Sequence, residues 1–263
     1  MKNLQDYLFV AIEAAKAAAQ IQNYYIGRDL EIDTKSSETD LVTKVDKLSE
    51  EKIREIIYNK YPDHIVLGEE QGQTGQASHR WIVDPLDGTL NYAHGFPFYC
   101  VSIALEINGE LQLGVVLDST RNELFTAIKG QGAFLDGAPI KTSTEDVLKK
   151  SMLATGFAYA EDTISENLEI FARVHHKVRS IRRPGAAALD LCYVACGRLD
   201  AFWELKLNPW DVAAGVLIIE EAGGKVTNRS GGEYILTDKV IIASNGVVHN
   251  KLVDLLDLEN SLA

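Results

Sequence analysis

Two aspartates, Asp84 and Asp87, are the residues in this sequence that are best placed to do chemistry. They follow the apolar stretch Arg80-Trp81-Ile82-Val83, where a strand is expected to end, and loops at strand ends commonly carry functional side chains. Pro85 stiffens the turn between them, and Gly88 allows the backbone to come close to a ligand. Asp, Pro and Gly are also ordinary turn formers, so on its own this segment could equally be a surface turn.

Three further acidic clusters lie at the expected ends of other elements. Glu69-Glu70 ends the preceding strand candidate, the segment Asp40–Asp46 leads into a helix, and Asp211 lies in the first turn of another helix. Each has an ordinary explanation, since adjacent acids are usually solvated, Thr43 with Asp46 can cap a helix, and Asp211 suits a helix dipole. Four such clusters nevertheless suit one shared site better than four separate accidents.

A shared site of this kind requires a cation. Carboxylates that are crowded together repel and raise one another's pKa values unless a positive charge joins them. The four clusters offer oxygen ligands and contain no His or Cys, which favours Mg²⁺ over Zn²⁺. The sequence therefore predicts a magnesium site with Asp84 and Asp87 at its centre.

Composition limits the other possibilities. The chain has 263 residues and a formal net charge of −12, which disfavours direct contact with nucleic acid. Residues 2–24 mix charged and apolar side chains and are expected to form an amphipathic helix, not a secretory signal. No apolar run approaches the ~20 residues that span a bilayer, so we expect a soluble, cytoplasmic protein without a membrane partner. Cys100, Cys192 and Cys196 lack C-x-x-C spacing, which argues against a disulfide framework or a zinc site, and Cys192 and Cys196 are expected to be buried, reduced packing residues.

The elements that must position these residues divide into two parts, and we expect the site where the parts meet. Residues 1–146 are predicted to be an α+β part, with helices laid on a largely antiparallel sheet and most of the metal ligands. Its clearest feature is Asn108-Gly109, which favours a type I′ hairpin turn. Residues 147–263 are predicted to be an α/β part that carries Asp211. The expected helices are 2–24, 45–57, 163–177, 186–196, one from Pro209 to Gly223, and a last one near the C-terminus; the expected strands are 65–67, 80–83, 101–107, 110–117, 152–157, 199–204 and 240–243.

The chain resembles the inositol monophosphatase family, in particular its bacterial branch, over nearly its whole length. The resemblance implies a layered αβαβα sandwich of the inositol monophosphatase/fructose-1,6-bisphosphatase type, a homodimer, and a Mg²⁺-dependent, Li⁺-sensitive phosphatase with two to three Mg²⁺ ions per active site. The segments that carry the resemblance are Asp40–Asp46, Gly68-Glu69-Glu70, Trp81–Tyr92, Arg182–Leu191, Trp210–Gly215 and Glu221–Gly224.

The resemblance also implies roles for individual residues. Glu69, Asp84 and the carbonyl of Leu86 are expected to hold one metal. Asp84, Asp87 and Asp211 are expected to hold a second, and a third, weaker ion is expected on Glu69 and waters. The predicted metal ligands thus all come from the acidic clusters and the turn between Asp84 and Asp87.

The remaining roles concern water and substrate. Thr89 and Glu69 are expected to orient the attacking water, supported by Asp46 and Thr43, so these four are the predicted catalytic residues. Glu204 is expected to accept hydrogen bonds from sugar or inositol hydroxyls. The full set of predicted substrate contacts is Asp87, Gly88, Thr89, Gly185, Ala186, Ala187, Glu204 and Asp211.

The predicted reaction is phosphomonoester hydrolysis by metal-activated water, which needs no nucleophilic side chain. A haloacid-dehalogenase-like mechanism is disfavoured, because its D-x-D-G-T pattern is one residue shorter than the spacing from Asp84 to Asp87. A phosphatase fold with a regulatory protein-binding role remains a candidate of a different class.

The substrate is left open at this point. The resemblance favours inositol 1-phosphate or a similar polyol phosphate. Fructose 1,6-bisphosphate is an alternative, alone or as a second activity, with Lys35, Arg182 or Arg183 as candidates for binding a second phosphate. Histidinol phosphate and 3′-phosphoadenosine 5′-phosphate are handled by relatives. Ala186 stands where many members carry Ser or Thr, which weakens any finer assignment.

Overall fold

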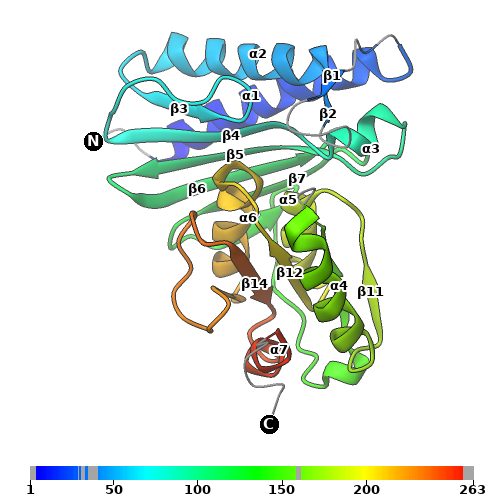
Figure 1. The fold of residues 1–263 in the computed structure, drawn as a ribbon. Coiled ribbons are helices and arrows are strands. Elements are labelled where there is room, and N and C mark those ends of the chain that lie inside the picture. Colours follow the sequence, from blue (N-terminus) through cyan, green and yellow to red (C-terminus); the bar gives the residue numbers. More distant parts are fainter. Residues whose placement is uncertain (1–3, 29, 31–32, 35–40, 158–160, 257–263) are drawn as a thin grey trace.

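The computed structural model describes residues 4–28, 30, 33–34, 41–157 and 161–256, so Lys35 and Asp40 lie outside the described residues. Its elements stack in the order helix, sheet, helix, sheet, helix, and this confirms the predicted αβαβα sandwich (Figure 1). The described helices are α1 (Leu4–Tyr25), α2 (Lys44–Lys60), α3 (Thr89–Ala93), α4 (Glu161–His175), α5 (Ala187–Ala195), α6 (Pro209–Glu221), α7 (His249–Leu256) and the 3₁₀ helix η1 (Leu148–Lys150).

The first sheet has seven strands in the order β3-β4-β5-β6-β7-β8-β9, and only β3 and β4 pair in parallel. The predicted hairpin is confirmed: Asn108 and Gly109 have φ angles of 53° and 85°, as a type I′ turn requires. The strands are β3 (Ile65–Gly68), β4 (His79–Asp87), β5 (Cys100–Ile107), β6 (Glu110–Asp118), β7 (Glu123–Ile128), β8 (Ala133–Leu135) and β9 (Ala138–Pro139).

Strand β4 does not end before Asp84, as the sequence predicted, but continues to Asp87. Asp84 pairs with Ser102 and Asp87 pairs with Cys100, so β4 contains one residue more than β5 between these pairs. The extra residue forms a bulge next to Pro85, which has no N–H to give to a ladder. In a regular strand, residues three apart point to opposite faces. The bulge allows both aspartates to face the same pocket.

The second sheet has the order β11-β10-β12-β14-β13 and is mixed, because β10 runs parallel to β11 and β12 while β14 is antiparallel to β12 and β13. The edge strands β11 and β13 were not predicted, since three residues are too few to show a pattern. The strands are β10 (Met152–Thr155), β11 (Ser180–Arg182), β12 (Ala201–Leu205), β13 (Lys225–Thr227) and β14 (Val240–Ser244), and a separate short pair is β1 (Asp33–Thr34) with β2 (Leu41–Val42).

Helices α5 and α6 fill the space between the two sheets (Figure 1). In α6 every residue from 212 to 219 is buried, because a helix with a sheet on either side needs no polar face. Small residues set its distance to the sheet: a Cβ on Gly114 of β6 would lie 2.7 Å from the carbonyl oxygen of Ala214. The two parts of the chain therefore share one continuous core.

Separate hydrophobic cores lie under the outer helices, α1 and α2 on one side and α4 and α7 on the other. Cys100, Cys192 and Cys196 are free thiols, and Cys192 is buried as predicted. Cys196 is only half-buried, because it lies at the end of α5. None of the described helices combines the length and the apolar composition that a membrane crossing would need.

A buried histidine joins α7 to the second sheet and should make stability depend on pH. His249 lies between the hydroxyls of Thr227 and Ser244, at 2.9 and 2.8 Å. Burial, followed by the nearby charge of Lys225, lowers the pKa of His249 from 6.5 to about 4. Between these two pKa values the unfolded chain binds a proton at His249 and the folded chain does not. The free energy of unfolding therefore falls as the pH drops from about 6.5 to about 4.

We predict that His249→Gln removes this part of the pH dependence, about 2 to 3 kcal/mol between pH 7 and pH 4.5. The measurement is the free energy of urea unfolding at both pH values. The same substitution at the exposed His176 should leave the wild-type profile unchanged. Equal pH profiles for His249→Gln and wild type would contradict the assignment.

Candidate active site

A cavity of about 340 Å³ opens where the two parts of the chain meet. Its walls come from the loop after β3, the end of β4, the start of α3, the segment 183–187, the end of β12 and the start of α6. Most of the predicted site residues line it: Glu69, Asp84, Leu86, Asp87, Gly88, Thr89, Gly185, Ala186, Ala187, Glu204 and Asp211. Thr43 and Asp46 are buried behind this surface and reach it through Thr89.

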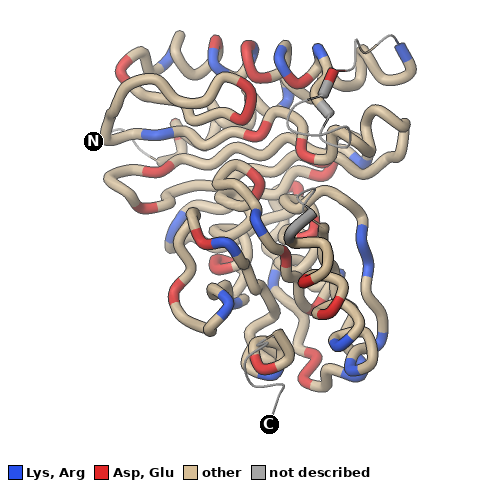
Figure 2. The backbone as a smooth tube through the Cα atoms, in the orientation of Figure 1, with Lys and Arg blue, Asp and Glu red and all other residues tan. Residues whose placement is uncertain are grey.

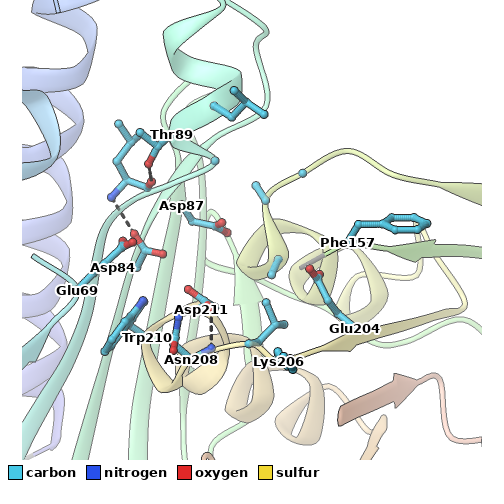
Figure 3. A pocket seen from close by; sticks show the side chains of 18 of the residues that line it. Glu69, Asp84, Asp87, Thr89, Phe157, Glu204, Lys206, Asn208, Trp210 and Asp211 are labelled. Atoms are coloured by element: carbon cyan, nitrogen blue, oxygen red, sulfur yellow. Dashed lines mark hydrogen bonds between the residues drawn. The ribbon is translucent and has the colours of Figure 1, made fainter. Parts of the chain in front are cut away.

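Figure 3 shows Glu69 and Asp84 on one side of the cavity, with Asp87 and Asp211 directed toward the same region. Asp84 is 2% exposed and accepts a hydrogen bond from the backbone N–H of Leu86 at 3.0 Å. Asp211 accepts one from the N–H of Asn208 at 2.7 Å. Asp211 therefore lies in the first turn of a helix, as expected, and its carboxylate also lines the cavity.

Asp87 connects the first sheet to the middle layer of helices. Helix α5 begins after Ala186, which has no side chain that could cap it. Asp87 supplies the missing acceptor, because one of its oxygens lies 2.7 Å from the N–H of Ala188. The same oxygen lies 3.6 Å from the thiol of Cys100. The position of Asp87 thus depends on both parts of the chain.

The carboxylates oppose one another's ionisation. Burial, followed by the charges of Glu69, Asp87 and Asp211, raises the pKa of Asp84 well above its usual value. Burial also raises the pKa of Asp87 to about 7, against the opposing effect of the Ala188 N–H, and burial and Glu69 raise that of Asp211. Among the described residues no Lys or Arg counts among the causes of these three shifts.

Buried oxygen ligands with excess negative charge fit a hard divalent cation. Within the described residues, however, no three Asp, Glu, His or Cys side chains stand at the spacing of a closed ligand set. A cation that bound here would supply the positive charge that these carboxylates lack. The donor chemistry fits a metal, and the geometry shows an open arrangement of donors.

A hydrogen-bonded chain leads from α2 to the rim of the cavity. The predicted capping box is confirmed, since Asp46 accepts from both the N–H and the hydroxyl of Thr43, at 2.8 and 2.7 Å. The other oxygen of Asp46 lies 2.9 Å from the hydroxyl of Thr89, which is also 3.0 Å from the carbonyl of Leu86. One hydroxyl has one proton, so Thr89 donates to only one of them at a time.

Gly88 and Gly185 shape the turn between the carboxylates and the far wall. Gly88 has a φ of 93°, and a Cβ there would lie 2.9 Å from the carbonyl oxygen of Phe98. Gly185 has a φ of 89° and packs against Asn91. Both positions therefore require glycine.

Glu204 lies apart from the other carboxylates, across the cavity (Figure 3). Burial and then Asp87 raise the pKa of Glu204 to about 8, while the nearby Arg183 lowers it. Its carboxylate rests against Gly156, where there is no room for a Cβ. This wall presents a buried polar group that can exchange hydrogen bonds with a ligand.

Sequence reasoning missed three polar residues that hold the site from behind, of which Gln22 and Glu50 are buried and Asn91 is half-buried. Gln22 of α1 donates to the carbonyl of Pro85 at 2.8 Å, and Asn91 of α3 donates to the carbonyls of Phe98 and Pro184, both at 2.8 Å. Glu50 of α2 is the third. Gln22 continues the spacing of the buried residues Ala11, Ala15 and Ala18, which is a signal that the sequence offered.

A model of the inositol monophosphatase family matches residues 3–260. The chain belongs to the inositol monophosphatase family. An inositol-1-monophosphatase of Synechocystis sp. is 45% identical over 254 residues, which cover 95% of this chain and 88% of the relative. The Nus factor SuhB of Escherichia coli strain K12 is 41% identical over 260 residues, which cover 97% of each chain.

Solved structures agree with this assignment. An inositol monophosphatase from Anabaena (Nostoc) sp. has a TM-score of 0.88 at 43% identity, covering 97% of this chain and 96% of that chain. An inositol monophosphatase/NADP phosphatase complexed with NADP and Ca²⁺ has the same TM-score at 27% identity, covering 98% and 97%. This member of the inositol monophosphatase family is therefore a phosphatase of a metal-dependent family.

Asn91 links the turn at Gly88 to the wall at Gly185, so its loss should lower the stability of this phosphatase. We predict that Asn91→Ala lowers the free energy of unfolding by about 1 to 3 kcal/mol, because two partly buried carbonyls lose their donor. Urea unfolding measures this. Truncation of the exposed Gln73, whose amide donates only to the nearby Gly75 carbonyl, should change stability by less than about 0.5 kcal/mol. Similar losses for both variants would contradict the bridging role.

Proposed function

We propose that this protein is a Mg²⁺-dependent phosphomonoesterase that releases phosphate from inositol 1-phosphate or a similar polyol phosphate. The observation that carries the proposal is the group of buried carboxylates, Asp84, Asp87 and Asp211 with Glu69, beside a separate polar wall at Glu204. The first group suits cations and the phosphate that they attract. The second suits the hydroxyls of the alcohol.

In this proposal two to three Mg²⁺ ions are held by Glu69, Asp84, the carbonyl of Leu86, Asp87 and Asp211. Such ions lower the pKa of bound water and neutralise charge on phosphate and leaving oxygens. Magnesium is favoured because every donor is oxygen. The Ca²⁺ in a solved relative supports a divalent cation in this family without deciding which one acts here.

The residues of the chain itself would position water and phosphate. Thr89, held by Asp46 at 2.9 Å, can orient a water, and its hydroxyl keeps lone pairs free for that contact. We assign the backbone N–H groups of Gly88 and Thr89 to the phosphate. A thiol nucleophile is not favoured, since burial raises the pKa of Cys100 and its thiol lies beside Asp87. Hydrolysis by positioned water remains the supported route.

The far wall supports a small polyol. A cavity of about 340 Å³ is at the lower end of ligand pockets, roughly 300–1,000 Å³, which favours a monophosphate of a compact alcohol over a nucleotide. Glu204 would accept from its hydroxyls, beside Gly185, Ala186 and Ala187. Histidinol phosphate and 3′-phosphoadenosine 5′-phosphate are the less favoured alternatives.

Fructose 1,6-bisphosphate remains the main competing substrate. Of the residues considered for a second phosphate, Arg183 lines the cavity. Arg182 instead donates to the hydroxyl of Ser180 and the carbonyl of Ile181. Arg183 is therefore the one described candidate from that set for recognising a bisphosphate.

Other parts of the proposal rest on likeness to the family. We propose a cytoplasmic homodimer that is inhibited by Li⁺ and makes no direct contact with nucleic acid. A regulatory protein-binding role is a second candidate, supported by the 41% identity to a protein named Nus factor SuhB. Capture of a partner by the Asp84→Asn variant, which should lack activity, would favour the second role over the first.

We predict phosphate release from inositol 1-phosphate that requires Mg²⁺, is abolished by EDTA and is inhibited by Li⁺. A panel with fructose 1,6-bisphosphate, histidinol phosphate and 3′-phosphoadenosine 5′-phosphate identifies the substrate. Asp84→Asn should lower kcat by about a thousandfold or more, because the bridging carboxylate is lost. Activity in EDTA, or near-wild-type turnover by Asp84→Asn, would overturn the mechanism.

A second prediction concerns the alcohol wall. Gly156→Ala places a methyl group where the carboxylate of Glu204 rests and should displace this flexible side chain at little cost in stability. KM for the polyol phosphate should rise about tenfold, as expected for the loss of a buried hydrogen bond, with kcat changed less. Glu204→Gln should also raise KM. An unchanged KM in both variants would remove Glu204 from substrate binding.

A further inference from the structure

Helix α2 carries charged residues of both signs along its length (Figure 2). Most are exposed or half-buried, but Asp46, Glu50 and Arg54 are buried and follow one another at intervals of four residues. This spacing places them on one face of the helix. Asp46 already has a part in the proposed site through Thr89. Glu50 and Arg54 have none.

Glu50 is 0% exposed, and its carboxylate is fully used by the chain around it. One oxygen accepts from the N–H of Glu70 at 2.7 Å. The other accepts from the N–H of Gln71 at 3.1 Å and from Nε of Arg54 at 2.8 Å. Two of these three donors are backbone groups of the loop that follows β3.

Arg54 binds both this loop and the strand β3 that leads into it. One Nη donates to the carbonyl of Gly72 at 2.7 Å, and the other reaches the carbonyl of Val66 at 3.3 Å. Gly68 and Gly72 also exchange backbone hydrogen bonds, at 3.1 and 3.0 Å. At Gly68 a Cβ would collide with the carboxylate of Glu50. The ion pair and the loop therefore fit together closely.

Glu69 lies inside this arrangement. The residue before it, Gly68, packs on the Glu50 carboxylate, and the residue after it, Glu70, donates to that carboxylate. The N–H of Glu69 itself donates to the carbonyl of Val83 in β4 at 3.2 Å. The backbone is thus held on both sides of Glu69, whose side chain lines the cavity.

A buried ion pair is a poor device for stability, because desolvation of the two charges offsets much of their attraction. An apolar pair would fill the same space but could not hold two N–H groups and a carbonyl of the loop together with a carbonyl of β3. The contacts made by Glu50 and Arg54 therefore fix the conformation of the loop.

We propose that Glu50, supported by Arg54, is a positioning residue that sets the backbone of the loop 68–72 and thereby directs Glu69 into the cation site. This inference rests on the proposed function, in which Glu69 binds a cation. Glu50 touches neither cation nor substrate in this scheme. It acts through the loop.

The test uses Glu50→Gln, which puts an amide NH₂ against groups that are themselves donors. Thermal unfolding at increasing Mg²⁺ should show that the concentration for half-maximal stabilisation rises about tenfold or more, as is typical when groups that orient metal ligands are changed. Without Mg²⁺, amide hydrogen exchange at Glu70 and Gln71 should accelerate about tenfold. The kcat for phosphate release should fall more than KM changes.

Glu221 provides a matched control. Its carboxylate also holds two loop N–H groups, those of Gly130 and Gly132 at 2.7 and 2.8 Å, but this loop does not line the cavity. Glu221→Gln should alter stability without shifting the Mg²⁺ dependence. An equal Mg²⁺ shift in both variants would overturn the positioning role.

A double variant separates positioning from folding if Glu50→Gln is too unstable to study. Glu50→Gln with Arg54→Met removes both buried charges, so it should recover stability relative to Glu50→Gln alone. It should not recover Mg²⁺ affinity, because the loop still lacks its acceptor. Wild-type Mg²⁺ affinity in the double variant would overturn the inference.

The failure of the proposed function has a different signature. If Mg²⁺ does not stabilise the wild-type protein, or Glu69→Gln is stabilised as strongly as wild type, Glu69 is not a cation ligand and the proposed function fails there. If both behave as expected while Glu50→Gln binds Mg²⁺ like wild type, only the positioning role fails.

Discussion

Mutual repulsion among buried carboxylates is the constraint on which the rest of this structure depends. Asp84, Asp87 and Asp211 are held in a desolvated cavity with Glu69, which raises the pKa of all three aspartates, while Asp87 also raises that of Asp84 and of Asp211. Such an arrangement is unfavourable for an isolated chain. It persists because each of the three aspartates is tied to a backbone N–H: Leu86 for Asp84, Ala188 for Asp87 and Asn208 for Asp211. The fold supplies the donors, and in the proposed function a cation would supply the missing charge.

The layered architecture makes those ties rigid. The bulge in β4 turns Asp84 and Asp87 to one side, and the first turn of α5 holds Asp87 from the other part of the chain. Helix α6 brings Asp211 in because glycines let it pack closely: a Cβ on Gly114 would meet the backbone at Ala214, and one on Gly215 would meet Leu191 at 2.6 Å. Interiors that are packed this closely have low compressibility, so the strands and helices that carry the carboxylates cannot move apart.

Local patterns in the sequence predicted the features that are decided locally. Asn108-Gly109 defines a turn, Thr43 with Asp46 defines a cap, and helical periodicity predicted α1 and α2. The carboxylates of the cavity were also identified, because acidic residues at element ends form a visible pattern. Features that depend on tertiary contacts were either not predicted or predicted incorrectly. The bulge in β4 depends on pairing with β5, the three-residue strands β11 and β13 depend on neighbours to pair with, and Glu50 resembles any charged helix residue until the loop at Gly68 folds onto it.

The same contacts limit how independently the reaction and its substrate can change. Asp84 and Asp87 lie on the first sheet and Glu204 lies on the second, so the proposed alcohol pocket could vary while the proposed cation site stays constant. The tie between Asp87 and Ala188 restricts this freedom, because α5 begins within the wall segment from Gly185 to Ala187. A change that moves the start of α5 must also move an acceptor in the cation site. Substitutions that alter only the side chain at Ala186, or the contact between Gly156 and Glu204, avoid that coupling, and these positions are therefore where substrate preference can change without loss of the reaction.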